Sequence, residues 1–414
     1  MNNLSNIICF IFISLMTILM IKKNTEKFLM ISLIGIFVCP QLSILEIKID
    51  FSYVFIAIFI LDILFNRMKI RKIKNIILKL MLLETAIYLL STLLNLLHPD
   101  RQIILMNIIG QIKNLVIFIV IYNFTNGKEN ININNIISPS IRIIVIINLI
   151  FMGIQYLNPM LGIDIIKTWY SNSNSLTLTS NISTLHRLYG ASYSPVITGY
   201  NMLLCLALEV TTKRNSMWII LMLCVGLMTT SKTFILGSIC IFLYFFYIEL
   251  KNKILIERIK FLAKIILICT IILIVINQLL ESNTNLYLDY YLKESFNIKN
   301  VLFNRVKETN DFTSDMINVI INNPIFGLGY NILGNYKVAD SDILITLYYG
   351  GICALIIHMC IYCKMLFTGF IKKEKKLIII SLLVVLVGIG QNSLFIPNTL
   401  AILGIILGDL DSKK

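Results

Sequence analysis

The chain has 414 residues, of which 57% are hydrophobic and only 14% are charged, and its mean hydropathy is +0.83. An ordinary soluble domain is about 45–50% apolar and about 25% charged, so this composition excludes a single core surrounded by water. We therefore expect an all-α polytopic membrane protein, folded as one integral membrane domain over residues 1–414.

The formal net charge of +14 arises largely from short basic stretches between apolar runs, at residues 67–74, 251–264 and 372–376. Lysine and arginine gathered in this way are typical of cytoplasmic loops beside anionic lipid. The distribution argues against nucleic acid as a partner and favours membrane lipid.

Apolar runs close to the roughly 17–25 residues of a membrane helix recur along the chain and predict about 12–13 spans. Helices are expected because the strands of a membrane barrel would alternate apolar and polar residues. No basic segment precedes the first run, which predicts a span with its N-terminus outside rather than a cleaved signal peptide. The runs are residues 4–21, 28–45, 51–65, 76–97, 103–122, 136–156, 193–210, 217–230, 233–249, 264–280, 342–362, 377–392 and 396–410.

With the basic loops in the cytoplasm, two long segments lie outside, residues 157–192 and 281–341. Loops of this length are uncommon unless they are functional. In the second, residues 311–322 predict an amphipathic helix that Pro324 ends and that lies along the membrane surface or covers a cavity. Because no nucleotide supply exists outside a cell, a reaction there needs a substrate activated beforehand, such as a lipid-linked diphosphate.

Charged residues also fall within predicted spans, where they are usually paired or functional. Glu84 and Lys113 lie in neighbouring spans, and we predict that they form an ion pair. Arg142 lies near a cytoplasmic end, from which its side chain can reach the headgroups. The nine cysteines, including Cys360 and Cys363, are interpreted as packing residues, so no metal or disulfide site is expected.

Two polar clusters border predicted spans on the outer side. In the first, His186, Arg187 and Gly190 precede a span, and Arg187 either holds a phosphate bidentately or reaches the headgroups. The second is the segment Thr229-Thr-Ser-Lys232, which is either a tight turn between two spans or a polar notch with Lys232 at the floor of an outer cavity.

Two further clusters lie in and after the second outer segment. Arg305 and Lys307 are either solvated loop residues or substrate ligands. Gly327-Leu-Gly329-Tyr330 is interpreted as a hinge that lays the loop onto the membrane, since glycine reaches conformations closed to other residues. Asp340 and Asp342 precede the next span, where each can cap the helix or act as a general base.

In this order the clusters resemble the O-antigen polymerase and ligase superfamily over residues 180–362. The resemblance rests on Arg187 with Gly190, Ser231-Lys232, Arg305, the run from Asn323-Pro324 to Gly329, and Asp340 eleven residues before Gly351. Lys232 stands where many members have arginine. Asp340 stands where the ligases have histidine, so the resemblance is nearer to the polymerases of capsular and O-antigen repeat units.

The resemblance implies a glycosyltransferase in the bacterial cytoplasmic membrane that joins undecaprenyl-diphosphate-linked oligosaccharides on the outer or periplasmic face. Arg187 and Arg305 would stabilise the leaving diphosphate and Asp340 would be the base, without nucleotide, metal or other cofactor. The implied substrate-binding residues are His186, Lys232, Lys307, Gly327, Gly329 and Asp342. A flippase and a chain-length regulator are candidate partners.

Three alternatives stay open at this point. A ligase would transfer finished glycan to an outer acceptor, a flippase would move lipid-linked oligosaccharide without chemistry, and a structural membrane subunit would need neither activity.

Overall fold

The computed structural model describes residues 2–44, 47–66, 75–95, 102–103, 105–126, 132–170, 175–184, 186–251, 320–332 and 341–413. These residues are helical apart from short loops and two antiparallel two-stranded ribbons, β1–β2 and β3–β4. The elements are α1 (Asn2–Ile21), α2 (Thr25–Val38), β1 (Leu42–Ile44), β2 (Ile47–Ile49), α3 (Phe51–Asn66), α4 (Ile76–Asn95), β3 (Gln102–Ile103), α5 (Leu105–Asn126), α6 (Ile133–Leu157), α7 (Pro159–Trp169), α8 (Ser175–Thr179), the π-helix η1 (Ser180–Thr184), α9 (Pro195–Thr211), α10 (Ser216–Met228), α11 (Lys232–Lys251), β4 (Asn331–Ile332), α16 (Asp342–Ile371), α17 (Lys375–Gly388) and α18 (Pro397–Ser412).

The expected all-α membrane class is confirmed. Within the described ranges, five helices are long and apolar enough to cross a membrane, namely α1, α4, α5, α6 and α16. Shorter apolar helices, among them α3, α9, α10 and α11, occupy other predicted runs. The predicted run at residues 264–280 and the predicted helix at residues 311–319 lie outside the described residues, whereas residues 320–322 are helical and the helix ends before Pro324 as expected.

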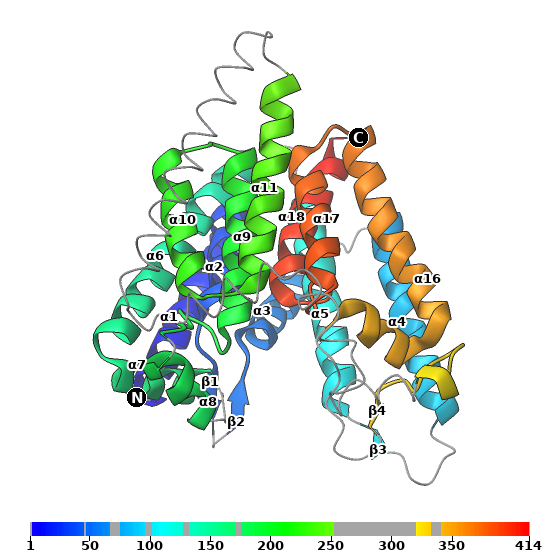
Figure 1. Ribbon diagram of the computed structural model, residues 1–414, viewed down its shortest axis with the longest axis horizontal. Coiled ribbons are helices and arrows are strands. Elements are labelled where there is room, and N and C mark those ends of the chain that lie inside the picture. The colour runs from blue at the N-terminus through cyan, green and yellow to red at the C-terminus, as the bar shows by residue number, and fades with distance from the viewer. Residues whose placement is uncertain are drawn as a thin grey trace, which may run out of the picture.

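The helices form two groups around a central layer (Figure 1). One group contains α1–α3, α6, α7 and α9–α11, and the other pairs α4 with α16. Between them lie α5, α17 and α18, and the N- and C-termini are at opposite ends of the molecule. The first outer segment of the sequence prediction, residues 157–192, holds α7, α8 and η1.

Small residues bring α18 against α5 in the central layer. A side chain on Gly404 would meet Ile121 Cβ at 3.1 Å, and one on Gly408 would meet Thr125 Cβ at 2.7 Å. This GxxxG spacing puts both glycines on one helix face, so the two backbones approach closely where no water drives the helices together. The sequence motif therefore sets the packing of the central pair.

The predicted Glu84–Lys113 ion pair is wrong. Lys113 Nζ lies 2.9 Å from Asp50 Oδ2 and over the ring of Tyr53, whereas Glu84 is bonded to His358 of α16. Neighbouring spans do not fix which faces meet, and α4 turns its polar face toward α16 instead.

Arg142 is paired inside the protein. Its guanidinium is 3.1 Å from Glu209 Oε1 and stacks over the ring of Trp218. The prediction that Arg142 reaches the lipid headgroups is therefore wrong: its side chain joins α6 to α9 through the ion pair with Glu209.

Candidate functional site

Helix α16 is broken at Gly351, where φ is +59° and ψ is −158°. The break leaves backbone groups of the helix without their usual partners four residues away. A segment of the preceding loop, Asn323–Tyr330, supplies these partners. Leu328 N donates to Tyr348 O at 2.7 Å and Gly329 N donates to Tyr349 O at 2.9 Å, while Ile352 N donates to Pro324 O at 2.8 Å.

The same segment is fixed to α4 on its other side. Ser91 Oγ donates to Phe326 O, Asn95 Nδ2 donates to Gly327 O at 3.1 Å, and Tyr330 N donates to Thr92 Oγ1 at 2.8 Å. A hinge should be free to rotate, so the interpretation of this segment as a hinge is wrong: it is a clamp that joins α4 to the broken helix.

The glycines of this clamp are required by close backbone contact. Gly327 and Gly329 have φ of +63° and +68°, and a Cβ on Gly327 would lie 2.5 Å from Tyr348 O. A Cβ on Gly329 would lie 2.3 Å from the backbone nitrogen of Thr92. The contacts explain these glycines by packing, and their predicted contact with substrate stays a prediction.

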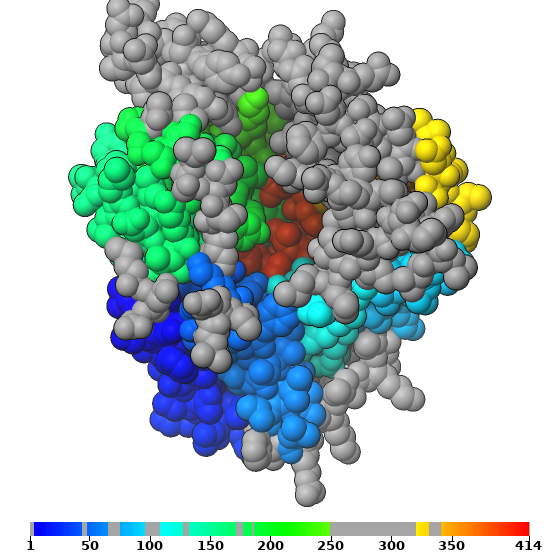
Figure 2. All heavy atoms as spheres, turned by 90° about the horizontal axis from the view of Figure 1, so that it is seen from below, coloured from blue at the N-terminus to red at the C-terminus, as the bar shows by residue number. Residues whose placement is uncertain are grey.

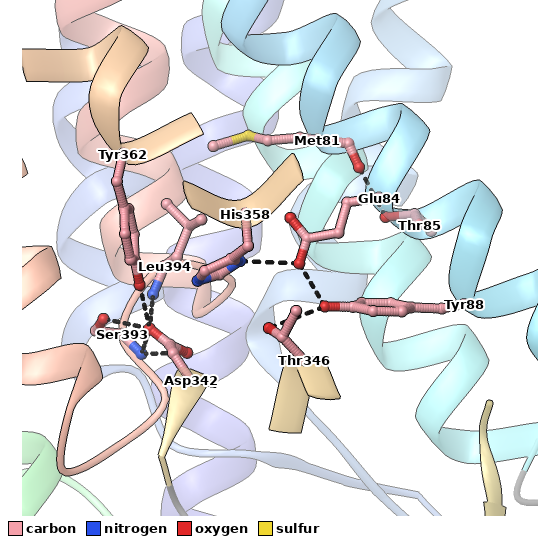
Figure 3. A network of polar contacts seen from close by, with 10 residues as sticks. All are labelled: Met81, Glu84, Thr85, Tyr88, Asp342, Thr346, His358, Tyr362, Ser393 and Leu394. Atoms are coloured by element: carbon pink, nitrogen blue, oxygen red, sulfur yellow. Dashed lines mark hydrogen bonds and ion pairs between the residues drawn. The ribbon is translucent and has the colours of Figure 1, made fainter. Parts of the chain in front are cut away.

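Because of the break, Asp342 at the start of α16 reaches Tyr362 in the second half of the same helix (Figure 3). Tyr362 Oη donates to Asp342 Oδ2 at 3.1 Å, and Asp342 is only 2% exposed. Ser393 N and Leu394 N donate to the same oxygen at 3.0 and 3.2 Å, and Ser393 Oγ also donates to it. Asp342 therefore does not cap its own helix but holds the loop between α17 and α18.

The second oxygen of this carboxylate is less occupied. Asp342 Oδ1 accepts only the shared Ser393 N–H, at 3.1 Å, among the hydrogen bonds within the described ranges. An anionic carboxylate has about four lone-pair sites, so Oδ1 retains capacity to accept a proton or a hydroxyl hydrogen bond.

The first polar cluster of the sequence, His186 to Gly190, forms a loop fixed by two amide side chains of α6. Gln155 Oε1 accepts Tyr189 N at 2.8 Å and Gly190 N at 3.1 Å, and Gln155 Nε2 donates to Gly190 O at 2.8 Å. Asn148 Oδ1 accepts Ala191 N at 3.0 Å. Gly190 has φ of +60°, which glycine adopts without strain.

This loop lies directly against the second cluster. Arg187 Nε donates to Thr229 O at 3.3 Å, and Leu188 N donates to Met228 O at 3.1 Å. The structure thus brings the Arg187 loop into contact with the Thr229–Lys232 notch. Burial raises the pKa of Tyr189 beside them, and the hydrogen bond from Asn181 and the charge of Arg187 oppose that shift.

The notch contains polar atoms that the protein does not satisfy. Ser231 is 1% exposed, and neither its hydroxyl nor that of Thr230 has a hydrogen-bond partner within the described part of the chain. Thr230 has φ of +47°, and α11 begins two residues later with Lys232. An unsatisfied buried hydroxyl is unfavourable, so its presence at the start of a helix is consistent with a ligand that supplies the missing bond.

The loop between α17 and α18, residues 389–396, joins the notch to Asp342. Thr233 Oγ1 lies 3.5 Å from Gln391 Oε1, and Tyr200 Oη lies 3.4 Å from Ser393 O and 2.9 Å from Thr399 Oγ1. Asn114 of α5 donates to Phe395 O at 2.6 Å. Sequence reasoning missed this loop, although its Gln-Asn-Ser run between two apolar helices was a signal that could have found it.

Three helices begin at this loop. Thr233 lies near the start of α11, Asp342 lies at the start of α16, and α18 follows the loop directly, whereas Tyr200 reaches the loop from the second turn of α9. Each helix N-terminus carries a partial charge of roughly +0.5, which the Asp342 carboxylate partly offsets within the same group.

Figure 2 shows one face of the molecule from the side of the β-ribbons, where C-terminal segments in red lie recessed between green and blue segments. Polar atoms of amide side chains in α5 and in the loop at residues 389–396 lack partners within the described residues, namely Gln111 Nε2, Asn114 Oδ1 and Asn392 Oδ1.

The structure leaves other predicted site residues apart from this group or undescribed. His186 is exposed, with φ of +46° and its ring 6.0 Å from that of Tyr156. Gly327 and Gly329 lie in the clamp on α4. Arg305, Lys307 and Asp340 lie outside the described residues, although Asp340 is two positions before Asp342 in the chain. Among the described residues, no group of three or more His, Cys, Asp or Glu side chains has metal-site geometry.

Comparison with known proteins adds no assignment: no family model matches this sequence, and no curated protein matches it.

Proposed function

We propose that this chain is a polysaccharide polymerase of the bacterial cytoplasmic membrane. It joins undecaprenyl-diphosphate-linked oligosaccharide repeat units on the outer face, and it crosses the membrane about 12–13 times with residues 157–192 and 281–341 outside. The observation that supports the proposal is the contact of Arg187 with the Thr229–Lys232 notch, next to a loop at which α11, α16 and α18 begin.

A diphosphate needs such a site when it leaves a sugar. Departure from the anomeric carbon increases the negative charge on its oxygens, and fixed positive groups then stabilise the transition state more than the ground state. Arg187, Lys232 and the helix N-termini supply this charge without a metal ion, and the open hydroxyl of Ser231 supplies a hydrogen bond. Arg305 is proposed as a second cation on the same diphosphate.

The acceptor needs a base and a polar surface. Asp340 is proposed as the base that takes the proton from the acceptor hydroxyl, with Asp342 Oδ1 and His186 as competing candidates. The amides of Gln111, Asn114 and Asn392 offer donors and acceptors that suit sugar hydroxyl groups. His186, Lys307, Gly327 and Gly329 are proposed to contact substrate.

The test is a deletion in the source cell, followed by analysis of its lipid-linked glycans. A polymerase predicts that single repeat units are exported and accumulate without longer polymer. Long lipid-linked polymer would assign a ligase instead, and repeat units trapped on the cytoplasmic face would assign a flippase.

Complementation with variants then tests the site. Arg187→Ala and Arg305→Ala should each lower polymer yield at least tenfold, because each removes a cation from the leaving group. Lys213→Ala, which removes an exposed cation from the turn between α9 and α10, is the matched control and should restore full polymer. Normal polymer length and yield in both arginine variants would refute the proposal.

A further inference from the structure

Glu84 of α4 and His358 of α16 form an acid–imidazole pair in the interior. Glu84 Oε1 lies 2.8 Å from His358 Nδ1, and the two side chains are 0% and 1% exposed. Tyr88 Oη donates to the same carboxylate oxygen and lies 3.2 Å from Thr346 Oγ1. The second half of the broken helix thus contacts the carboxylate directly through His358, and the first half contacts it indirectly, through Thr346 and Tyr88 (Figure 3).

One polar atom of each side chain in this pair makes no hydrogen bond within the described residues. Glu84 Oε2 and His358 Nε2 are buried and have no hydrogen-bond partner among the described residues. A carboxylate bonded to Nδ1 holds the proton on that nitrogen, which leaves Nε2 as the atom at which the imidazole gains or loses a proton. Within a membrane, a buried ionisable pair with such an atom is a candidate functional site.

His358 Nε2 faces Asp342 and the residues that hydrogen-bond to it. In Figure 3 the second ring nitrogen of His358 lies on the side of Leu394 and Asp342, away from Glu84. The His358 ring packs edge-on against the Tyr362 ring, with centroids 4.5 Å apart, and Tyr362 Oη donates to Asp342 at 3.1 Å. An unbroken series of contacts therefore runs from Glu84 to Asp342.

The charges around the imidazole come from two helices. Within the described ranges, the titratable groups that face it are Glu84 and Tyr88 of α4 and Asp342 and Tyr362 of α16. The loop between α17 and α18 adds Phe395, whose ring centroid is 6.2 Å away. Two carboxylates thus flank one imidazole in a region of low dielectric constant, where each charge strongly affects the others.

We propose that Glu84 and His358 are a proton-exchanging pair coupled to the Asp342 carboxylate, and that both are positioning residues for the proposed reaction on the outer face. The inference rests on the proposed function. In that reaction the acceptor oxygen bonds to the anomeric carbon, the bond from that carbon to the diphosphate oxygen breaks, and the diphosphate leaves with the electron pair. The acceptor proton goes to the base, Asp340 or Asp342 Oδ1, and protonation of Asp342 removes the negative charge that favours a proton on His358 Nε2.

Nitrogen NMR of histidine tests the coupling without any substrate. The chain has three histidines, so His98→Gln with His186→Gln leaves His358 as the only labelled residue in the purified full chain. We expect its Nε2 signal to titrate. Asp342→Asn removes a negative charge near the imidazole, so it should move the midpoint of that titration.

A matched control uses the other buried ion pair. Glu209→Gln breaks the bridge to Arg142 and should leave the His358 titration unchanged. Absence of titration, or an equal midpoint in Asp342→Asn, would overturn the coupling.

Activity tests the positioning role separately. Glu84→Gln and His358→Gln should lower polymer yield at least tenfold and change its dependence on external pH, which a loss of packing alone would not do. Normal polymer at every pH in both variants would refute the role. If Arg187→Ala and Arg305→Ala leave polymer unchanged while the NMR coupling holds, the proposed function fails and the coupled pair stands.

Discussion

Asp342 and Tyr362 are twenty residues apart in one helix, yet the carboxylate oxygen of the first is 3.1 Å from the hydroxyl oxygen of the second. In a straight helix this separation would be about 30 Å. The helix must therefore fold back at Gly351, which carries Asp342 into the interior beside the loop between α17 and α18. The position of this residue depends on the break, and the first prediction concerns the break itself.

Gly351→Ala should destabilise the protein by about 2–4 kcal/mol, because it combines a positive φ with a Cβ that would lie 2.4 Å from the carbonyl of Ile325. Thermal aggregation of the detergent-purified chain measures the effect. Gly153→Ala, in a helix and with no atom within 4 Å of the new methyl group, is the control and should be neutral or stabilising. Equal melting of the two variants would contradict this account of the clamp.

Ser231→Ala should separate stability from function. The hydroxyl is buried without a partner in the described part of the chain, so its removal should leave stability unchanged or raise it by about 1 kcal/mol. Polymer yield should still fall several-fold if the hydroxyl binds the diphosphate. A stable variant with full polymer yield would show that the notch is only a turn.

Asp342→Ala should lower both stability and polymer yield, because it leaves Ser393 N, Leu394 N and Tyr362 Oη without their acceptor. We expect a loss of about 3–5 kcal/mol from leaving buried donors unpaired. Combining it with Ser393→Ala should add little further loss, since both act on the same contact. Additive effects of the two changes in thermal unfolding would contradict the proposed contact.

The Lys113–Asp50 pair predicts a specific double-mutant cycle. Lys113→Met and Asp50→Asn together should destabilise the protein by about 1 kcal/mol less than the sum of the two single changes. The coupling energy is expected to be this small because Asp50 is partly exposed to solvent. The cycle of Lys113→Met with Glu84→Gln is the control and should be additive. Coupling in the second cycle but not in the first would restore the pairing expected from sequence.

Apolar runs predicted most of the described helices because a membrane imposes length and hydropathy on every span. The run at residues 28–45 is an exception, since α2 ends at Val38 and residues 42–44 form the strand β1. The runs did not predict that α16 is two helices, since Gly350-Gly351 is compatible with a continuous helix until the clamp is seen. Pairing of charges was also beyond the sequence, because Glu84 and Lys113 are close along the chain but their helices face different partners.

The candidate site was predicted in part. The motifs indicated Arg187 and the Thr229–Lys232 segment as separate polar clusters, and the structure shows that they are in contact. The sequence did not indicate that Ser393 and Leu394 would meet Asp342 or that Gln155 would hold the Arg187 loop, since these contacts join residues far apart in the chain. Such contacts depend on how whole helices pack, which local patterns do not specify.

The clamp also has a consequence for biogenesis. Residues 323–330 are synthesised before Gly351, so the segment that hydrogen-bonds to the backbone at the break already exists when α16 is made. Without that segment, the exposed N–H and C=O groups at the break would each be unfavourable by several kcal/mol in hydrocarbon. Docking of residues 323–330 on α4 therefore stabilises the inserted form of α16, and we expect a chain whose clamp cannot dock to insert poorly and to be removed by membrane quality control.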